Sequence, residues 1–449
     1  MTDLRAPRVL LGASALLLAA ACSDTPTGAS TTGHTDVVGS VKAAAVPLSG
    51  AADQYNPLLA TLDGRRFVLL GEATHGTHEF YAERAAISQR LIGEQQFAAV
   101  IVEGEWEDAW RVNHYVRGRG SDASAAAALS GFNQFPLWMW RNQEVAGFVE
   151  WLRAYNEGRP TEQRVGFYGM DLYGLMESLQ EVPQLLDPID PVAAERARDR
   201  YACFDPYSSP ESYGNEMSTG NATCEADAKA QFDELHARWA AAPADERLFN
   251  AMQNARVVMG AEAYLRRSYR GGGGWATRDR HMAETVADLS THQQARGMSG
   301  KVITWAHNSH VGDGRAAAMG AEMSITLGRL MRERVGAQAA LVGFTTYSGS
   351  VIAAEDWGMS GEERTVSPGL GGSWEAVFHQ VGSPRFLLLL GESPVAAELG
   401  EQQLLERAIG VSYHPETERQ SHYFSSGLAD RFDAVIHIDE TSALVPLAR

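Results

Sequence analysis

The sequence predicts an α/β protein: a three-layer core with a mostly parallel β-sheet flanked by helices, plus an inserted helical subdomain. Short apolar segments rich in β-branched residues recur along the chain, which is typical of strands buried on both faces. Helical patterns separate several of them, as in parallel sheets. The chain has 449 residues with 45% hydrophobic and 21% charged residues, enough for a large core. Its formal net charge of −18 excludes the basic surface of a nucleic-acid-binding protein.

The predicted elements follow from these patterns in chain order. Buried strands are expected at 67–70, 98–102, 165–168, 302–305, 340–344, 386–390, 409–413 and 434–438. Helices are expected between them, for example at 78–92 and 144–155. The segment 177–270 is largely helical in pattern and rich in Ala and Glu, so we predict that it is the inserted subdomain. It ends at the glycine run 271–274, before a helix at 277–289.

The N-terminal segment is typical of an export signal. Residues 1–8 carry Arg5 and Arg8, and an apolar run at 9–21 precedes Cys22 directly. The apolar run is too short to span a bilayer. Because Leu-Ala-Ala-Ala-Cys at 18–22 resembles a lipobox, we expect Cys22 to be acylated after removal of residues 1–21. The protein is then expected outside the cytoplasm, as a lipoprotein on the periplasmic side of a bacterial membrane or as a secreted protein.

The mature chain is predicted to consist of a tether and one globular domain. Residues 22–52 are mostly small and polar, as in a flexible linker, and the pattern becomes globular over 53–449. Cys203 and Cys224 remain as an even pair of thiols in an oxidising compartment. We therefore expect a disulfide between them, which would stabilise the fold by about 3 kcal/mol in the chain-entropy description.

Polar side chains gather directly after four of the predicted strands. In a parallel sheet the carboxyl ends of the strands share one edge, where ligands bind. Four separate segments should therefore bring the candidate residues to one place. These candidates are Glu72, His75, Glu103, Asp171, His307 and His310. Arg84 lies on the helix that follows the first of these segments, where it could hold a carboxylate in its ionised form.

Two chemistries are compatible with this cluster. A His polarised by a Glu can act as a general base on water, while a second His or an Arg stabilises the oxyanion. Alternatively, His75, His307 and His310 could join a carboxylate in holding a metal that generates hydroxide. The sequence has neither the Gly-x-Ser-x-Gly motif of a serine nucleophile nor a phosphate-binding P-loop motif.

An ordered set of motifs resembles the erythromycin esterase family, which includes succinoglycan-biosynthesis-like proteins. The motifs are GEATHGTHE at 71–79 followed by Arg84, EG at 103–104, WMWRN at 138–142, RDRHM at 278–282, WAHNSH at 305–310, and GVSY at 410–413 with PETE at 415–418. The resemblance covers about residues 55–446. It implies a hydrolase with a three-layer α/β core around a deep cleft, and known members open the macrolactone ring of erythromycin-type antibiotics.

The resemblance also implies roles for individual residues. His75 would be the general base on water, without an obligatory metal or other cofactor. Glu72, Arg84, Glu103, His307 and His310 match further motif positions and are the other expected catalytic residues. Asp171 and the aromatic residues Phe135, Trp138 and Trp140 are expected to contact a bulky lactone. We accordingly expect a carboxylic ester hydrolase linked to macrolide resistance.

Two alternatives remain open from the sequence. One is a metal-dependent hydrolase of another ester, because the spacing of the His residues does not exclude a metal. The other is a non-catalytic, haem-binding lipoprotein, for which several His and Tyr residues could act as ligands. The expected partner is a small-molecule ester, with membrane contact only through the lipid anchor; the sequence predicts no oligomeric state.

Overall fold

The structure is a computed structural model that describes residues 36–220, 223–391, 393–400 and 402–448. Within these residues a nine-stranded sheet has the order β1-β8-β11-β6-β2-β5-β3-β4, with β7 paired to β6. The strands are β1 (Val46–Pro47), β2 (Phe67–Leu70), β3 (Ala99–Glu105), β4 (Gly166–Asp171), β5 (Val302–Trp305), β6 (Ala339–Ala353), β7 (Glu362–Val366), β8 (Arg385–Leu389) and β11 (Ala434–Thr441). β9 (Leu404–Arg407) and β10 (Tyr423–Ser426) form a separate antiparallel pair.

The six strands from β11 to β4 run parallel to one another, so the predicted mostly parallel sheet is confirmed. The antiparallel strands lie at or near the margins: β8 and β1 extend the sheet beyond β11, and β7 pairs with the long strand β6. β2 and β5 are buried along their whole length. Strands buried on both faces have continuous apolar sequences, and this is why the pattern identified them.

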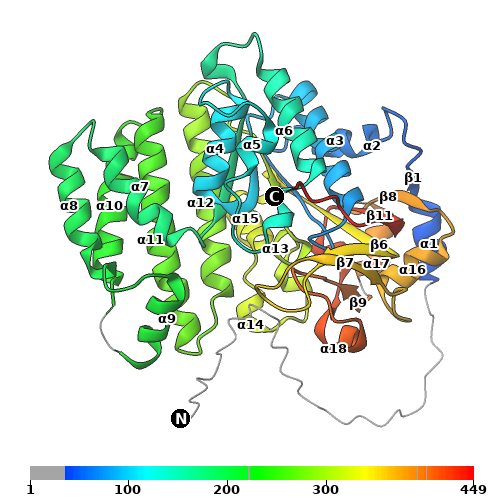
Figure 1. Cartoon of the computed structure of the whole chain (residues 1–449). Coiled ribbons are helices and arrows are strands. Elements are labelled where there is room, and N and C mark those ends of the chain that lie inside the picture. The colour runs from blue at the N-terminus through cyan, green and yellow to red at the C-terminus, as the bar shows by residue number, and fades with distance from the viewer. Residues whose placement is uncertain (1–35, 221–222, 392, 401, 449) are drawn as a thin grey trace.

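Successive residues of the central strands enter different hydrophobic cores. Phe67 and Leu69 of β2 belong to one core, whereas Val68 and Leu70 belong to the other. This alternation follows from the two-residue period of a strand. The sheet is therefore the middle of three layers, with a helical layer and a hydrophobic core on each side (Figure 1).

Helices from different parts of the chain cover the two faces. The core that contains Leu69 receives side chains from α1 (Val37–Ala44), α12 (Trp275–Ala295), α15 (Leu327–Val335), α16 (Trp374–Gln380) and α17 (Pro394–Gly400). The core that contains Val68 is covered mainly by α2 (Asn56–Leu62), α3 (His78–Gln95), α4 (Trp106–Val116), α5 (Ala125–Leu129) and α6 (Gln143–Asn156). Short helices α13 (Asn308–Val311), α14 (Gly320–Met323), α18 (Glu418–Ser421) and α19 (Leu428–Arg431) lie in the connections.

The connection between β4 and β5 is a long helical segment. It contains α7 (Leu175–Leu186), α8 (Pro191–Tyr201), α9 (Pro210–Thr219), α10 (Glu225–Ala241), α11 (Glu246–Tyr269) and finally α12. In Figure 1 the green helices α7–α11 form a group beside α12, away from the sheet. Cys203 and Cys224 form a disulfide, with Cα atoms 5.8 Å apart, that closes the segment carrying α9.

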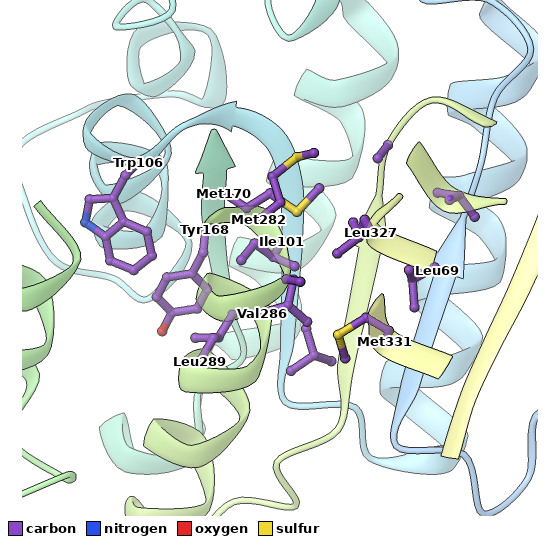
Figure 2. Packing of buried hydrophobic residues seen from close by; sticks show 14 of the residues in the cluster. Leu69, Ile101, Trp106, Tyr168, Met170, Met282, Val286, Leu289, Leu327 and Met331 are labelled. Atoms are coloured by element: carbon purple, nitrogen blue, oxygen red, sulfur yellow. The ribbon is translucent and has the colours of Figure 1, made fainter. Parts of the chain in front are cut away.

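Helix α12 joins this helical group to the sheet. Figure 2 shows Met282, Val286 and Leu289 of α12 beside Ile101 of β3 and Met170 of β4. These five side chains are at most 1% exposed. The spacing of 282, 286 and 289 places the three α12 residues on one face of the helix. Their burial therefore sets the position of α12 on the sheet.

Two expectations from the sequence are corrected by the structure. Residues 409–413 do not form a strand: Ile409 and Ser412 make only isolated bridges, to Thr74 and Ala354. Ile409 and Tyr413 are buried in a small separate core, which accounts for their strand-like alternation. The flexible tether expected at 22–52 is also wrong for residues 36–48, because α1 and β1 pack there against the domain and Val41 is fully buried.

The export signal at 1–21 and the candidate lipidation residue Cys22 lie outside the described residues, so these expectations remain predictions. In the part of the chain that the structure describes, no helix combines the length and the hydropathy required to cross a bilayer.

Candidate active site

The candidate residues come together at one edge of the sheet. β2, β5, β3 and β4 are neighbours in the sheet and run parallel, so their carboxyl ends lie side by side. β2 leads to the segment with Glu72 and His75, and β3 ends with Glu103 and Glu105. β4 ends at Asp171 and β5 leads to His307 and His310, which completes the cluster. The sheet topology thus assembles the site from distant parts of the chain.

His75 is held by a carboxylate behind it. Its Nδ1 lies 2.8 Å from Oε1 of Glu72, and the Tyr81 hydroxyl donates to the His75 carbonyl oxygen at 2.7 Å. Because Nδ1 donates to a carboxylate in the neutral ring, the free electron pair is on Nε2. Nε2 makes no hydrogen bond with any described residue, and the His75 side chain lines a large cavity. His75 is therefore arranged to accept a proton from a molecule in this cavity.

Arg84 holds the other oxygen of the same carboxylate. Its Nη2 donates to Oε2 of Glu72 at 2.6 Å, and both side chains are fully buried. The guanidinium carbon lies 4.3 Å from the centre of the Tyr81 ring and 5.2 Å from that of Trp305. The ion pair and the cation–π contacts offset part of the desolvation of the charge, while Nε and Nη1 of Arg84 have no hydrogen-bond partner among the described residues. Glu72 and Arg84 thus fix the imidazole of His75 without lining the cavity.

His307 is a neutral imidazole that presents an N–H group. It is the N-cap of α13, and its Nδ1 accepts from the backbone N–H of Ser309 at 3.2 Å. Burial and the neighbouring His75 lower the pKa of His307 well below its usual value. With Nδ1 as acceptor, the proton of the neutral ring is on Nε2. This buried Nε2–H has no hydrogen-bond partner among the described residues, and the ring centre lies 4.9 Å from that of His75.

Arg278 of α12 joins two carboxylates on neighbouring strands. Its Nη2 donates to Oε1 of Glu103 at 2.7 Å, and its Nε donates to Oδ1 of Asp171 at 2.9 Å. The backbone N–H of His307 also donates to Oε2 of Glu103, at 2.8 Å. Burial alone would raise the pKa of Glu103, but the charges of His310 and Arg278 dominate and keep it well below its usual value. Glu103 is therefore ionised and fixed in position.

His310 lies between two carboxylates and below an aromatic ring. Its Nδ1 is 2.9 Å from Oδ2 of Asp279, its Nε2 is 3.3 Å from Oε1 of Glu103, and the Trp275 ring stacks on it with centres 4.3 Å apart. Burial favours the neutral ring, yet the charges of Asp279 and Glu103 outweigh it and raise the pKa of His310 to about 9. His310 is thus charged at neutral pH.

A hydrogen bond from Arg278 to His310 would require a neutral imidazole as the acceptor. Nη1 of Arg278 lies 3.0 Å from Nε2 of His310, and a guanidinium can only donate. A charged imidazole instead directs Nε2–H to Glu103. We assign the charged form because the ring has a carboxylate at each nitrogen, and opposite charges at this distance favour the ionised state.

A cavity of about 960 Å³ extends from these residues towards the helical segment. At the sheet edge it is lined by His75, Glu103, Asp171, His307 and His310, which the sequence predicted. Aromatic side chains of the helical segment, including Tyr173, Tyr264, Tyr269 and Trp275, line it as well. Its volume lies at the upper end of the usual range for small-molecule sites.

The three aromatic residues predicted to bind substrate do not all lie at the cavity surface. Phe135 and Trp140 line the cavity, whereas Trp138 does not and is 4% exposed. Trp138 packs edge-on against Phe135, with ring centres 5.3 Å apart. It therefore supports the wall of the cavity from behind, and the expected contact between Trp138 and substrate is corrected accordingly.

Four residues of the site were not among the sequence-predicted candidates: Glu105, Trp275, Arg278 and Asp279. Arg278 and Asp279 belong to the RDRHM motif at 278–282, and this motif was the available signal. Within the described residues, no three or more His, Cys, Asp or Glu side chains are arranged to hold a metal ion. The site is instead built from ion pairs and His–carboxylate hydrogen bonds.

The fold and the site define an α/β protein with a His–Glu pair facing a cavity at the carboxyl edge of the sheet. The family model of erythromycin esterase matches residues 92–441. The chain belongs to the erythromycin esterase family, a family of ester hydrolases. This membership confirms the family resemblance seen in the sequence.

Similar proteins include both named esterases and proteins of other description. Erythromycin esterase type II of Escherichia coli is 22% identical over 322 residues, which cover 67% of this chain and 74% of that protein. A Bacillus cereus protein of solved structure has a TM-score of 0.75 at 19% identity, covering 92% of this chain and 98% of that one. A succinoglycan biosynthesis protein has a TM-score of 0.73 at 20% identity, with 91% and 98% covered.

A mutant of the erythromycin esterase EreC, solved in its open conformation, is also similar in structure. Its TM-score is 0.62 at 16% identity, with 87% of this chain and 94% of that chain covered. At these identities the structural similarities establish the shared fold.

Proposed function

We propose that this protein hydrolyses a macrolactone or a related bulky cyclic ester, with His75 as the general base. The observation that carries the proposal is the geometry of His75. Its Nδ1 is bonded to Glu72, and its unpartnered Nε2 belongs to a side chain that lines the cavity. A base in this position can take a proton from water as the water attacks a carbonyl carbon.

The neighbouring His307 supports the same reaction. Attack by water places negative charge on the former carbonyl oxygen, and a preorganised donor lowers the energy of this oxyanion. His307 is buried, and its Nε2–H has no hydrogen-bond partner among the described residues. We infer that this N–H group donates to the oxyanion.

The substrate class is supported by the cavity and by the relatives. The cavity of about 960 Å³ has room for a large ring, and Phe135 and Trp140 offer it apolar contact. One relative is an erythromycin esterase of Escherichia coli. Opening of the lactone would inactivate the antibiotic, so we propose a role in macrolide resistance.

Mass spectrometry of erythromycin incubated with the purified protein tests this proposal. We expect the drug to gain the mass of one water molecule. His75→Ala should lose about 10²–10⁴-fold in rate, because it removes the general base. His78→Ala is the matched control: His78 belongs to the same motif, but it is half exposed, is bonded to Glu144 and does not line the cavity.

Two results would contradict parts of the proposal. A folded His75→Ala variant with unchanged activity would exclude His75 as the base. Hydrolysis of small esters without any change of erythromycin would retain the hydrolase and exclude this macrolide as a substrate.

A further inference from the structure

Three acidic side chains on the neighbouring strands β3 and β4 line one region of the cavity. They differ in whether a positively charged side chain pairs with them. Glu103 and Asp171 share the guanidinium of Arg278. Glu105, the last residue of β3, is aligned with Asp171 of β4 and also lines the cavity. The Glu105 side chain makes no hydrogen bond or ion pair with any other described residue. A cavity carboxyl group is therefore left without a partner beside two carboxyl groups that share one guanidinium.

The surroundings of Glu105 favour its protonated form. Further acidic groups surround it: Asp171 on β4, and Glu107 and Asp108 in the first turn of α4. Arg278 and the N-terminus of α4 favour the charged form and oppose this effect. Burial, followed by the charge of Asp171, prevails and raises the pKa of Glu105 to about 8. The carboxyl group thus carries a proton at neutral pH.

Ester hydrolysis at this site needs a proton donor as well as a base. His75 takes a proton from the attacking water, and an alkoxide must then leave the tetrahedral intermediate. An alkoxide is a poor leaving group unless it is protonated as the bond breaks. The other carboxylates are unsuited to this task, because Glu103 is held ionised and Asp171 is paired with Arg278.

We propose that Glu105 is the general acid that protonates the departing alcohol. This inference rests on the proposed function. When the bond between the acyl carbon and the alkoxy oxygen breaks, its electron pair stays on that oxygen, which takes the proton of the Glu105 carboxyl group. The hydroxyl group of water remains on the acyl carbon. His75 releases its proton to solvent and Glu105 regains one, so ester and water become acid and alcohol.

The leaving group provides a sharp test. Ethyl butyrate releases a strongly basic alkoxide, whereas 4-nitrophenyl butyrate releases a stable anion from the same acyl group. In the near-isosteric variant Glu105→Gln we expect kcat for ethyl butyrate to fall by about 10²–10⁴-fold. Its kcat for 4-nitrophenyl butyrate should remain close to that of the unsubstituted protein. His75→Ala should lose activity on both esters, because both require activated water.

The pH profile of the unsubstituted protein is a second readout that needs no variant. Glu105 donates a proton only while it is protonated, so kcat for ethyl butyrate should fall as pH rises above about 8. The profile for 4-nitrophenyl butyrate should lack this loss, and any loss from the titration of His310, whose pKa is about 9, should be the same for both esters. Glu157→Gln is the matched control for the loss of one carboxylate, because Glu157 is exposed at the end of α6 and does not line the cavity.

The outcomes separate this inference from the proposed function. If Glu105→Gln slows both esters equally, or if both pH profiles fall together above pH 8, Glu105 is not the general acid while the hydrolase stands. If the unsubstituted protein cleaves neither these esters nor erythromycin, the proposed hydrolase is contradicted, and the role of Glu105 with it.

Discussion

At the scale of single residues, His310 couples the free energy of unfolding to pH. Its pKa in the folded protein is about 9, whereas the ordinary value is 6.5. The folded state therefore binds the proton more tightly than the unfolded state does. The resulting stabilisation is complete below about pH 6.5 and is lost as pH rises through 9. It amounts to at most about 3 kcal/mol across this range.

We predict that His310→Gln removes this part of the pH dependence. The difference in Tm between the unsubstituted protein and the variant should shrink between pH 6.5 and pH 9.5, and calorimetry at several pH values measures it. Glu105 titrates in both proteins, so its effect cancels in the difference. A difference that stays constant over this range would show that His310 is not charged in the folded protein.

Most site residues that directly follow a strand could be predicted, as could Arg84 on the helix after the first motif, whereas those that α12 contributes could not. Glu72, His75 and His307 stand next to buried apolar runs, so the sheet geometry alone places them at one edge. Arg278 and Asp279 lie about one hundred residues beyond β4, within a helix. Their contacts depend on how α12 packs, and a single sequence does not specify this packing.

At the scale of elements, α12 connects the hydrophobic core to the site. Met282 is fully buried beside Met170 and Ile101 (Figure 2). Arg278 lies one turn earlier on the same helix. We predict that Met282→Ala lowers the free energy of unfolding by about 2–5 kcal/mol, because the lost side chain leaves a cavity. Urea denaturation followed by circular dichroism measures this loss.

Met282→Leu is the matched control for that prediction. Leu has a similar volume, so the variant should lose less than about 1.5 kcal/mol. Equal losses in the two variants would indicate that the chemistry of the thioether, rather than the filled volume, determines stability at this position.

Continuous apolar runs identified the parallel strands well. The errors occurred where apolar residues pack outside the main sheet, or where a strand has no apolar run. The segment at 409–413 alternates because Ile409 and Tyr413 pack in a small core without a neighbouring ladder. β1 is a two-residue edge strand that contains Pro47, so it offered almost no pattern. β7 was missed because its residues are mostly exposed, and an edge strand does not need an apolar run.

At the scale of the whole molecule, the cavity is assembled from several parts of the chain, including the sheet edge, the helical segment between β4 and β5, and the segments 132–140 and 408–424. The sheet edge supplies His75 and His307, and the helical segment between β4 and β5 supplies one part of the remaining wall. Asn215 and Ser218 of α9 belong to that wall, and they lie inside the loop that the disulfide between Cys203 and Cys224 closes. The disulfide therefore contributes both to stability and to the shape of the cavity.

Removing this disulfide should have two measurable effects. We predict that the double variant Cys203→Ser/Cys224→Ser loses about 3 kcal/mol of unfolding free energy, because the unfolded chain regains the entropy of a loop of 21 residues. The KM for a bulky lactone should rise more than the KM for a small ester, since only the large substrate reaches α9. Dithiothreitol should lower the Tm of the unsubstituted protein to that of the variant. A Tm unaffected by the reductant would contradict the stabilising role of the disulfide. If the double variant changes the KM of both substrates by the same factor, α9 does not contact the bulky lactone.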